Sequence, residues 1–383
     1  MPAAEPAHGE GHSMVRRGIA FSVIMGTLLY SSTWFMTSTW LHLTGYTNSA
    51  WRTLPMIFIL GFLPASLLSF RWSNPVLAAF YKVFATALGF LNLGVAASII
   101  SWAVWGIVSL IGLPITSREV AISFFGAAAV ATIYGLFNAA RLQITRVTVR
   151  LAKLSDEWQG RTVALVSDIH VGNVRGPRFV HKIVSRLRKL NPAAVLIAGD
   201  MFDGSKVDLP KSVQPWAALS APAGVYFVSG NHDEFSDRRP ALAALKEVGV
   251  RVLDNEKVTV EGLQIIGVHD GEAGEQVLYR DILSRAAIDP EQASILLTHQ
   301  PSGLAVPEAA GIGLQVSGHT HGGQFWPWTW IIQRAHGRFS YGLQRFGKMQ
   351  VFTSSGSGTW GPPLRIATKS EIVLIRLEAE PAV

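Results

Sequence analysis

Polar side chains of a few types recur directly after short apolar runs in the second half of the chain. The runs RTVALVSD, AAVLIAGD, GVYFVSGNHD and SILLTHQ deliver aspartate, asparagine or histidine at their ends, and SGHTHGG adds two histidines in a glycine-rich turn. The residues in question are Asp168, His170, Asp200, Asn231, His232, His299, His319 and His321. Carboxylate, amide and imidazole groups without a thiol suit divalent ions of the Mn, Fe or Zn kind. Two such ions about 3.5–4 Å apart are the usual apparatus for hydrolysing phosphate esters.

The chemistry of individual residues favours this interpretation. Asp200 offers oxygen ligands that can contact two cations at once, which a neutral imidazole cannot do. Asn231 can ligate through its amide oxygen without adding charge, which leaves the cluster positive enough to bind a phosphate. His232 would lie over the leaving group, where a side chain that titrates near neutrality can act as a general acid or stabilise charge. A single strand-end aspartate is more often a cap than a ligand, so the prediction depends on the whole set.

Buried strands joined through helices must position these side chains. The β-branched, uncharged runs are typical of strands covered on both faces. Between the first two runs, RFVHKIVSRLRKL places Phe179, Ile183, Val184 and Leu187 at helical spacing. The sequence therefore predicts an α/β domain whose polar residues meet at the carboxyl ends of the strands, where ligand crevices form.

Five ordered motifs, SDIHVG, GDMFDG, GNHDE, THQP and GHTHGGQ, resemble those of the calcineurin-like metallophosphoesterases over roughly residues 160–378. The resemblance implies a sandwich of two mixed β-sheets flanked by helices, with ligands for two metals and one bridging carboxylate. By this resemblance the first metal is held by Asp168, His170 and His321, the second by Asn231, His299 and His319, and Asp200 bridges them. Asp203, in GDMFDG, matches the family residue that orients His232.

Other residues near the motifs have weaker assignments. His181, His269 and His336 do not match ligand positions. We expect His181 on an exposed helix face and His269, in GVHDGE, at the surface more readily than in the cleft. Arg365, in GSGTWGPPLR, could contact a phosphate through its planar guanidinium, although a surface ion pair is the commoner fate of an arginine.

The first part of the chain has a different composition, with long apolar stretches that carry almost no charge. Each is long enough to cross a bilayer core of about 30 Å. We interpret them as four transmembrane spans within residues 19–141. If the third stretch held a tight pair of helices, the number of spans would be five. The stretches are residues 19–41, 53–70, 75–115 and 120–140.

Lysine and arginine residues divide unequally between the two sides of a four-span arrangement. The positive-inside rule then places the amino-terminal tail, residues 1–18, and everything after residue 141 in the cytoplasm. Residues 142–159 would be a basic linker against anionic headgroups, followed by the catalytic domain, residues 160–383. The more basic side carries Arg16, Arg17, Arg71, Lys82, Arg141, Arg146, Arg150 and Lys153, against Arg52 and Arg118 on the other.

The segment FWPWTWII follows the histidine motif at once and holds Trp326, Trp328 and Trp330. We expect it at the mouth of the crevice. Because tryptophan suits a membrane interface, our hypothesis is that the segment faces the bilayer and admits a lipid-bearing phosphate. The alternative is that these rings pack inside the domain or against the membrane helices.

These observations together predict an integral membrane phosphohydrolase with two divalent ions, Mn, Fe or Zn. The favoured substrate is a lipid-linked phosphodiester or pyrophosphate, and a soluble nucleotide or phosphate ester is the alternative within the enzyme class. A non-catalytic, metal-binding membrane scaffold is the alternative outside it. The absence of cysteine excludes disulfides and thiolate metal sites. A nucleic-acid partner is not expected, and the sequence leaves the oligomeric state open.

Overall fold

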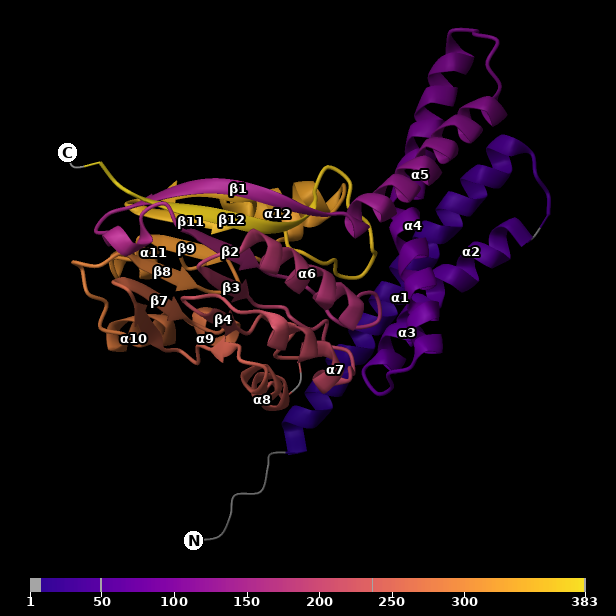
Figure 1. Cartoon of the computed structure of the whole chain (residues 1–383). Helices are drawn as coiled ribbons and strands as arrows, with labels where there is room; N and C mark the ends of the chain where they lie inside the picture. The colour runs from indigo at the N-terminus through magenta and orange to yellow at the C-terminus, as the bar shows by residue number, and fades with distance from the viewer. Residues whose placement is uncertain (1–7, 49, 236, 382–383) are drawn as a thin grey trace. The chain divides into compact units, whose positions relative to one another are not determined.

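The structure, a computed structural model, describes residues 8–48, 50–235 and 237–381, apart from the side chains of residues 8–19 and 21. The chain divides into two compact units, each described by itself. Met1–Leu68 with Val83–Thr132 forms the first, and Ser69–Lys82 with Ile133–Val383 forms the second. In Figure 1 the amino-terminal helices run from indigo to purple, and the strands from magenta to yellow.

Helices alone occupy the first part of the chain. They are α1 (His8–Thr44), α2 (Ala50–Leu60), α3 (Phe62–Ser69), α4 (Pro75–Leu110) and α5 (Ser117–Ala140). Among the described residues, three stretches are long and apolar enough to cross a membrane: Ala50–Ser69, Pro75–Leu110 and Ser117–Ala140. These features indicate a membrane protein.

The structure bears directly on two of the predicted spans. Within the stretch 75–115, which could have held a helix pair, Pro75–Leu110 forms one helix, α4. The stretch 19–41 is helical as part of α1, but some of its side chains lie outside the part of the chain that the structure describes. It is not among the three candidate membrane spans found in the described residues.

Small and hydroxyl-bearing residues let the helices of the first unit approach one another and satisfy their own polar groups. A Cβ atom on Gly94 would lie 2.3 Å from Sδ of Met36, so a larger residue does not fit there. The hydroxyls of Thr33 and Thr37 donate to main-chain carbonyls four residues back. Both features are typical of helices packed in lipid, where backbones come close and no water satisfies a hydroxyl.

Two six-stranded mixed sheets form the framework of the second unit. The first has the order β1-β12-β2-β3-β4-β5 and the second β10-β11-β9-β8-β7-β6. The first sheet comprises β1 (Leu142–Leu151), β2 (Thr162–Val166), β3 (Ala194–Ala198), β4 (Val225–Val228), β5 (Arg251–Val252) and β12 (Ser370–Ala379). The second comprises β6 (Lys257–Val260), β7 (Leu263–Gly267), β8 (Ser294–Leu297), β9 (Leu314–Ser317), β10 (Gly342–Phe346) and β11 (Met349–Thr353).

The sheets pack face to face, and helices cover their outer faces, as the resemblance implied. Leu165 and Leu196 of the first sheet share one apolar cluster with Ile295 and Val316 of the second. Outside the first sheet, α6 (Pro177–Leu190) and α8 (Arg239–Glu247) pack over it, and α10 (Gln276–Arg285) and α11 (Ala305–Ala309) pack over the second. The remaining helices are α7 (Leu209–Val213), α9 (Asp270–Ala273) and α12 (Trp328–His336), with short 3₁₀ turns between elements (Figure 1).

The segment predicted as a basic linker is instead largely a strand of the first sheet. β1 pairs in parallel with β12 along its whole length. In its last half, Arg146 and Arg150 are exposed, whereas Val149 and Leu151 are buried between the sheets. The positive charges that suggested a membrane flank therefore lie on one side of an amphipathic edge strand.

Candidate metal centre

Five strands of the two sheets present their carboxyl ends to one site. In the first sheet, β2 is followed by Asp168 and His170, β3 by Asp200, and β4 by Asn231 and His232. In the second sheet, β8 is followed by His299, and β9 by His319 and His321. Contacts between these side chains bring both sheets to the same place.

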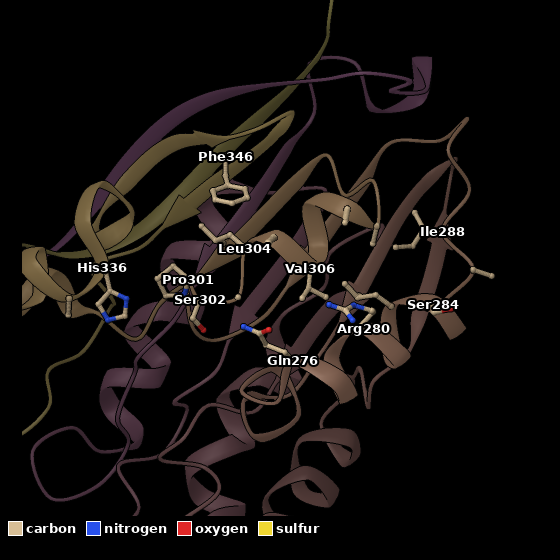
Figure 2. A pocket seen from close by; sticks show the side chains of 17 residues that line it. Gln276, Arg280, Ser284, Ile288, Pro301, Ser302, Leu304, Val306, His336 and Phe346 are labelled. Carbon is tan, nitrogen blue, oxygen red and sulfur yellow. The ribbon is translucent and has the colours of Figure 1, made fainter.

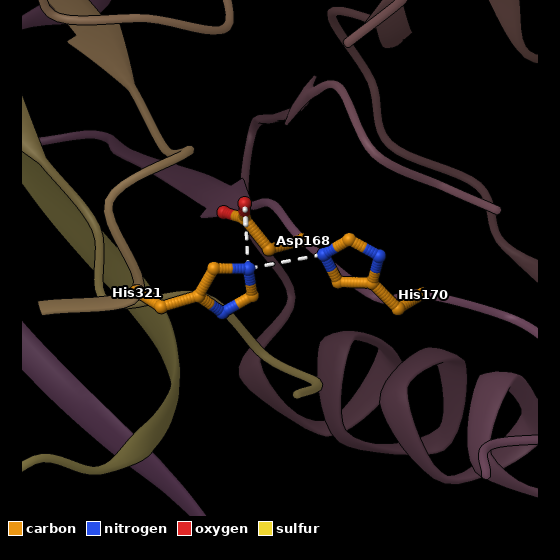
Figure 3. A group of neighbouring side chains, drawn as sticks. All are labelled: Asp168, His170 and His321. Atoms are coloured by element: carbon orange, nitrogen blue, oxygen red, sulfur yellow. Dashed lines mark hydrogen bonds and ion pairs between the residues drawn. The ribbon is translucent and has the colours of Figure 1, made fainter. Parts of the chain in front are cut away.

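Asp168, His170 and His321 form the first group of possible ligands (Figure 3). Nε2 of His321 lies 3.0 Å from Nε2 of His170 and 3.5 Å from Oδ1 of Asp168. All three side chains are buried. Their donor atoms therefore point at one another with little access for water.

Asn231, His299 and His319 form the second group. Oδ1 of Asn231 lies 3.1 Å from Nε2 of His299 and 3.0 Å from Nδ1 of His319. The two histidine nitrogens are 3.2 Å apart. An amide oxygen and two imidazole nitrogens thus converge as the resemblance implied.

Asp200 lies between the two groups. Its Oδ2 is 3.6 Å from Nε2 of His170 in the first group and 3.2 Å from Nε2 of His299 in the second. Its Oδ1 accepts a hydrogen bond of 2.9 Å from the main-chain N–H of His232. One carboxylate oxygen therefore faces ligands of both groups.

The chemistry of the donor set fits divalent cations. The Nδ1 of His299 lies 2.8 Å from the carbonyl of Ala198, which can accept its proton and leave Nε2 free to ligate. The backbone also leaves room for the carboxylates, because a Cβ atom on Gly230 would lie 2.2 Å from Oδ1 of Asp200. Carboxylate, amide and imidazole donors suit Mn, Fe and Zn alike.

Comparisons with known proteins agree with this geometry. A family model described as calcineurin-like phosphoesterase matches residues 161–323. This chain carries a calcineurin-like metallophosphoesterase domain. The family uses divalent metals, and the described Asp and His groups are able to bind them.

Several relatives combine the metallophosphoesterase domain with further sequence. An uncharacterized metallophosphoesterase of Campylobacter jejuni is 30% identical over 242 residues, which cover 62% of this chain and 64% of that protein. One of Helicobacter pylori is 33% identical with the same coverage. A transmembrane protein with metallophosphoesterase domain from Danio rerio is 33% identical over 268 residues, covering 65% of this chain and 61% of that protein. The chain thus spans less than two thirds of the length of these relatives.

Burial and neighbouring carboxylates shift the pKa values of the four histidines proposed as ligands. It lowers the pKa of His170 and of His319 to about 3, and that of His321 well below its usual range. Burial alone would also lower the pKa of His299, but the carboxylates of Asp200 and Asp168 raise it to about 10. Three of the four imidazoles are therefore neutral, which is the form that binds metal.

The backbone of the metallophosphoesterase domain is strained at the site. Non-glycine residues seldom adopt a positive φ, and such residues cluster at functional sites. Five of the seven predicted ligands have φ between 50° and 69°. They are Asp168, His170, Asp200, His319 and His321. The tight turns that follow the strands hold these side chains toward the centre at the expense of local backbone energy.

Asp233 joins two of the loops that carry ligands. Its buried carboxylate accepts N–H bonds from Gly230 at 2.9 Å and from Phe202 at 3.0 Å, with a longer one from Met201 at 3.3 Å. Burial raises its pKa to about 7. The loops after β3 and β4 are thereby held together, which positions Asp200 against Asn231.

His232 meets Asp203 in a different way from the one we expected. Its Nδ1 lies 3.2 Å from the main-chain carbonyl of Asp203, not from the carboxylate. The carboxylate of Asp203 accepts N–H bonds from Asn173 at 3.2 Å and Ser205 at 2.8 Å. Any orienting effect of Asp203 on His232 therefore acts through the backbone of its loop.

Sequence reasoning missed two aromatic side chains beside His232. The ring centres of Phe235 and Trp360 lie 4.3 Å and 5.5 Å from that of His232, and both side chains are exposed. Reciprocal hydrogen bonds of 2.9 and 3.0 Å join the main chain of Trp360 to the amide of Gln324. The signal was present in the sequence, since Trp360 belongs to the glycine-rich segment GSGTWG and Gln324 to GHTHGGQ.

Arg365 is fully buried, so neither a surface ion pair nor an exposed phosphate contact describes it. Its guanidinium donates to the carbonyls of His321 at 3.0 Å, Gly358 at 2.8 Å and Ser355. Its own carbonyl accepts a 3.0 Å bond from the amide of Asn138, in the last turn of α5. Arg365 therefore clamps the loop of His321 to the segment that carries Trp360.

His269 is fully buried, which contradicts our expectation of a surface histidine, whereas His181 is exposed as predicted. The Nδ1 of His269 accepts an N–H bond of 2.8 Å from Ser229, and its Nε2 lies 3.2 Å from Oδ1 of Asp254. It follows β7, every residue of which is buried. Its role is to hold the end of β4, just before Asn231.

An open groove of about 960 Å³ is lined by residues of α10, α11 and the end of α12. Figure 2 shows His336 at one end of its lining and Ile288 toward the other, with Leu304 and Phe346 between them. The ring of His336 packs edge-on against that of His319, with centres 6.0 Å apart. One residue of the groove lining, His336, therefore packs against a predicted ligand.

Proposed function

We propose that this chain is a multi-pass membrane phosphohydrolase that uses two divalent ions to cleave a lipid-linked phosphodiester or pyrophosphate. The observation that carries the dinuclear part is the position of Asp200, whose Oδ2 faces His170 on one side and His299 on the other. A carboxylate placed between two ligand groups suits a bridge between two cations. Such a pair would bind the phosphate of the substrate at this cluster of residues.

The ligand assignment follows the two groups. Asp168, His170 and His321 would hold one ion, and Asn231, His299 and His319 the other, with Asp200 shared. When bound, such a pair neutralises phosphoryl oxygens and lowers the pKa of a bound water toward neutrality. The residues of this chain hold the donors, exclude water and orient the substrate. Mn, Fe and Zn all suit these ligands.

His232 is proposed to donate a proton to the departing oxygen. Its Nδ1 faces a backbone carbonyl, which can keep that nitrogen protonated and direct Nε2 away from the Asp203 loop. Phe235 and Trp360 flank the ring and limit its rotation. This arrangement suits a leaving group that approaches from the exposed aromatic side.

Substituting His232 by alanine tests this role. We expect kcat for bis-aryl phosphate to fall by about 10²- to 10⁴-fold, the usual contribution of general acid catalysis, with metal content unchanged. His181→Ala, on the exposed face of α6, serves as the matched control. His232 also lies close enough to His170 and Asp200 to ligate a cation. Loss of one metal from His232→Ala would therefore assign it as a ligand and contradict the proton-donor role.

Two features support a lipid as the rest of the substrate. Phe235 and Trp360 make the surroundings of His232 apolar although both are exposed to solvent. The groove that ends at His336 is lined mainly by apolar side chains, including Leu304, Val306 and Phe346. We infer that the apolar chain of a lipid substrate lies along this groove while its phosphate binds at the centre.

A larger side chain in the groove should distinguish a lipid-linked substrate from a small soluble one. Ala309 is exposed on α11 and lines the groove, so Ala309→Phe should obstruct it without disturbing the core. We expect kcat/KM for a nucleotide-diphospho-lipid in detergent to fall by at least tenfold, while bis-aryl phosphate is unaffected. Ala217→Phe, at an exposed site outside the groove lining, is the control. Equal losses of kcat/KM on both substrates would contradict the lipid substrate. The proposal that the chain is a phosphohydrolase would still stand.

The alternatives predict different results. A phosphatase of soluble nucleotides or phosphate esters would hydrolyse aryl phosphates and nucleotides well, and Ala309→Phe would not change its rate of hydrolysis. A metal-binding scaffold would be inactive on every substrate with Mn, Zn and Fe. The buried donor set and the position of His232 favour an enzyme over the scaffold.

The cytoplasmic orientation is also a proposal, and it rests on charge. We infer that residues 19–41 also cross the bilayer, in addition to the three candidate spans among the described residues. With α4 as one helix this gives four spans, and an even number leaves the amino terminus and the metallophosphoesterase domain on the same side. That side carries the larger share of lysine and arginine, which the positive-inside rule assigns to the cytoplasm.

A further inference from the structure

The surface around α12 is both aromatic and cationic. Between Glu308 and Glu371 the sequence contains no aspartate or glutamate. The basic residues in that interval are Arg334, Arg338, Arg345, Lys348, Arg365 and Lys369. Arg365 is buried, whereas Arg334 and Arg338 lie in α12 and just after it and are exposed.

Arg334 and Arg338 keep their charge available. Both are exposed, and neither forms an ion pair with the described residues. By contrast, Arg345 pairs with Glu380 at 3.3 Å and Lys369 with Glu371 at 3.5 Å. Two uncompensated guanidinium groups therefore remain at the end of α12 and just after it.

The same segment exposes large aromatic rings. No residue of α12 is buried, and the exposed fractions of Trp326, Trp328 and Trp330 are 56%, 47% and 53%, with Ile331 at 40%. Solvent exposure of so many adjacent rings is unfavourable, so a patch of this kind marks a surface that becomes covered. This result also excludes packing of these side chains in the interior of the domain.

The cations and the rings are arranged together. The guanidinium of Arg334 lies 4.7 Å from the ring centre of Trp330, and that of Arg338 lies 5.0 Å from that of Phe339. Arginine stacked on an aromatic face keeps its charge at the edge of an apolar surface. A protein partner would need an acidic and apolar face of matching shape, whereas an anionic lipid surface supplies both elements at once.

We propose that α12, together with Trp326, docks on an anionic lipid surface. The rings would lie at the level of the headgroups, where tryptophan is enriched, and Arg334 and Arg338 would pair with lipid phosphates. The helix would lie in the plane of the interface, as short amphipathic helices with basic and aromatic residues do. Docking of this kind does not depend on hydrolysis, and it brings the centre that follows β9 to the surface that carries lipid phosphates.

A single label can test the docking in the full chain, because the chain contains no cysteine. Ile331→Cys places a spin label on α12, and Val277→Cys places one at a site on α10 that is 82% exposed. Each variant is reconstituted in phosphatidylcholine vesicles with and without phosphatidylglycerol. The accessibility of the label to oxygen, which concentrates in lipid, is compared with its accessibility to a water-soluble nickel chelate.

With phosphatidylglycerol, the label at position 331 should gain accessibility to oxygen and lose accessibility to nickel, while the label at position 277 should not change. Combining Ile331→Cys with Arg334→Gln and Arg338→Gln should lower the ratio of docked to undocked protein by roughly 30-fold, from the usual contribution of two basic residues at an anionic surface. A label at 331 that stays accessible to nickel in both vesicles would overturn the proposal. A label inaccessible to both reagents would overturn it in favour of a protein partner or a second copy.

Hydrolysis of bis-aryl phosphate, measured on the same samples, keeps this proposal distinct from the proposed function. Normal hydrolysis without docking would overturn the proposed docking of α12 and leave the proposed enzymatic function standing. Docking without hydrolysis would overturn the proposed function and leave the docking proposal standing.

Discussion

Asp200→Asn should remove at least one metal ion and lower hydrolysis of bis-aryl phosphate by more than about 100-fold, the upper range for losing a residue that only supports a ligand. The physical reason is the position of Oδ2 between His170 and His299. Asparagine has one oxygen and no charge, and its NH₂ group would face either these imidazoles or the main-chain N–H of His232. Metal content by elemental analysis and kcat/KM measured on the same preparation would show both effects.

The matched control is Asp208→Asn. Asp208 caps the amino terminus of α7 by accepting the N–H of Lys211 at 3.1 Å, and asparagine caps helices equally well. The control should keep both metals and full activity. If Asp200→Asn also retained two ions per chain and most of its activity, the carboxylate would not be a bridge and the dinuclear proposal would fail.

Arg365→Met should destabilise the catalytic domain by about 3 kcal/mol or more, because three buried carbonyls lose a charged donor and each unsatisfied group costs about 1–3 kcal/mol. For a domain of this size such a loss lowers Tm by roughly 6–12 °C. Arg365→Lys should recover only part of it, since an ammonium cannot reproduce the planar set of donors. Thermal unfolding of the full chain in detergent, followed by tryptophan fluorescence, measures the shift.

Arg146→Met provides the comparison, because Arg146 is an exposed residue of β1. Its Tm should stay within about 2 °C of the original. An unchanged Tm in Arg365→Met with loss of activity alone would mean that the guanidinium acts on substrate and does not clamp the loop.

The convergence of the proposed ligand residues could be predicted from sequence because their chemistry and their local structure coincide. Asp168, Asp200 and His299 each follow a short apolar run, and the carboxyl ends of neighbouring strands meet at one place. The motifs also fix the tight turns, where residues such as His319 adopt a positive φ. Local sequence was therefore sufficient to predict which side chains converge.

The residues that the sequence did not place correctly depend on distant partners. The exposed charges of Arg146 and Arg150 suggested a linker, and only the pairing of β1 with β12 shows why the intervening residues are buried. Arg365 and His269 looked like surface residues because nothing near them in sequence indicates the carbonyls and loops that enclose them. The aromatic pair Phe235 and Trp360 comes together from positions 125 residues apart.

The hydrogen bond from Asn138 to the carbonyl of Arg365 bears on how the catalytic domain can be isolated. At the end of α5, Asn138 also donates to the carbonyl of Thr368, and the carbonyl of Ala139 accepts a bond from Ser370, the first residue of β12. A shortened, soluble form beginning at residue 160 would lack β1 and these hydrogen bonds. The segment that carries Arg365 would then have no partner for the carbonyl that Asn138 now bonds. A fragment that starts before Asn138 retains this junction and is the better choice for crystallisation and for assays without detergent.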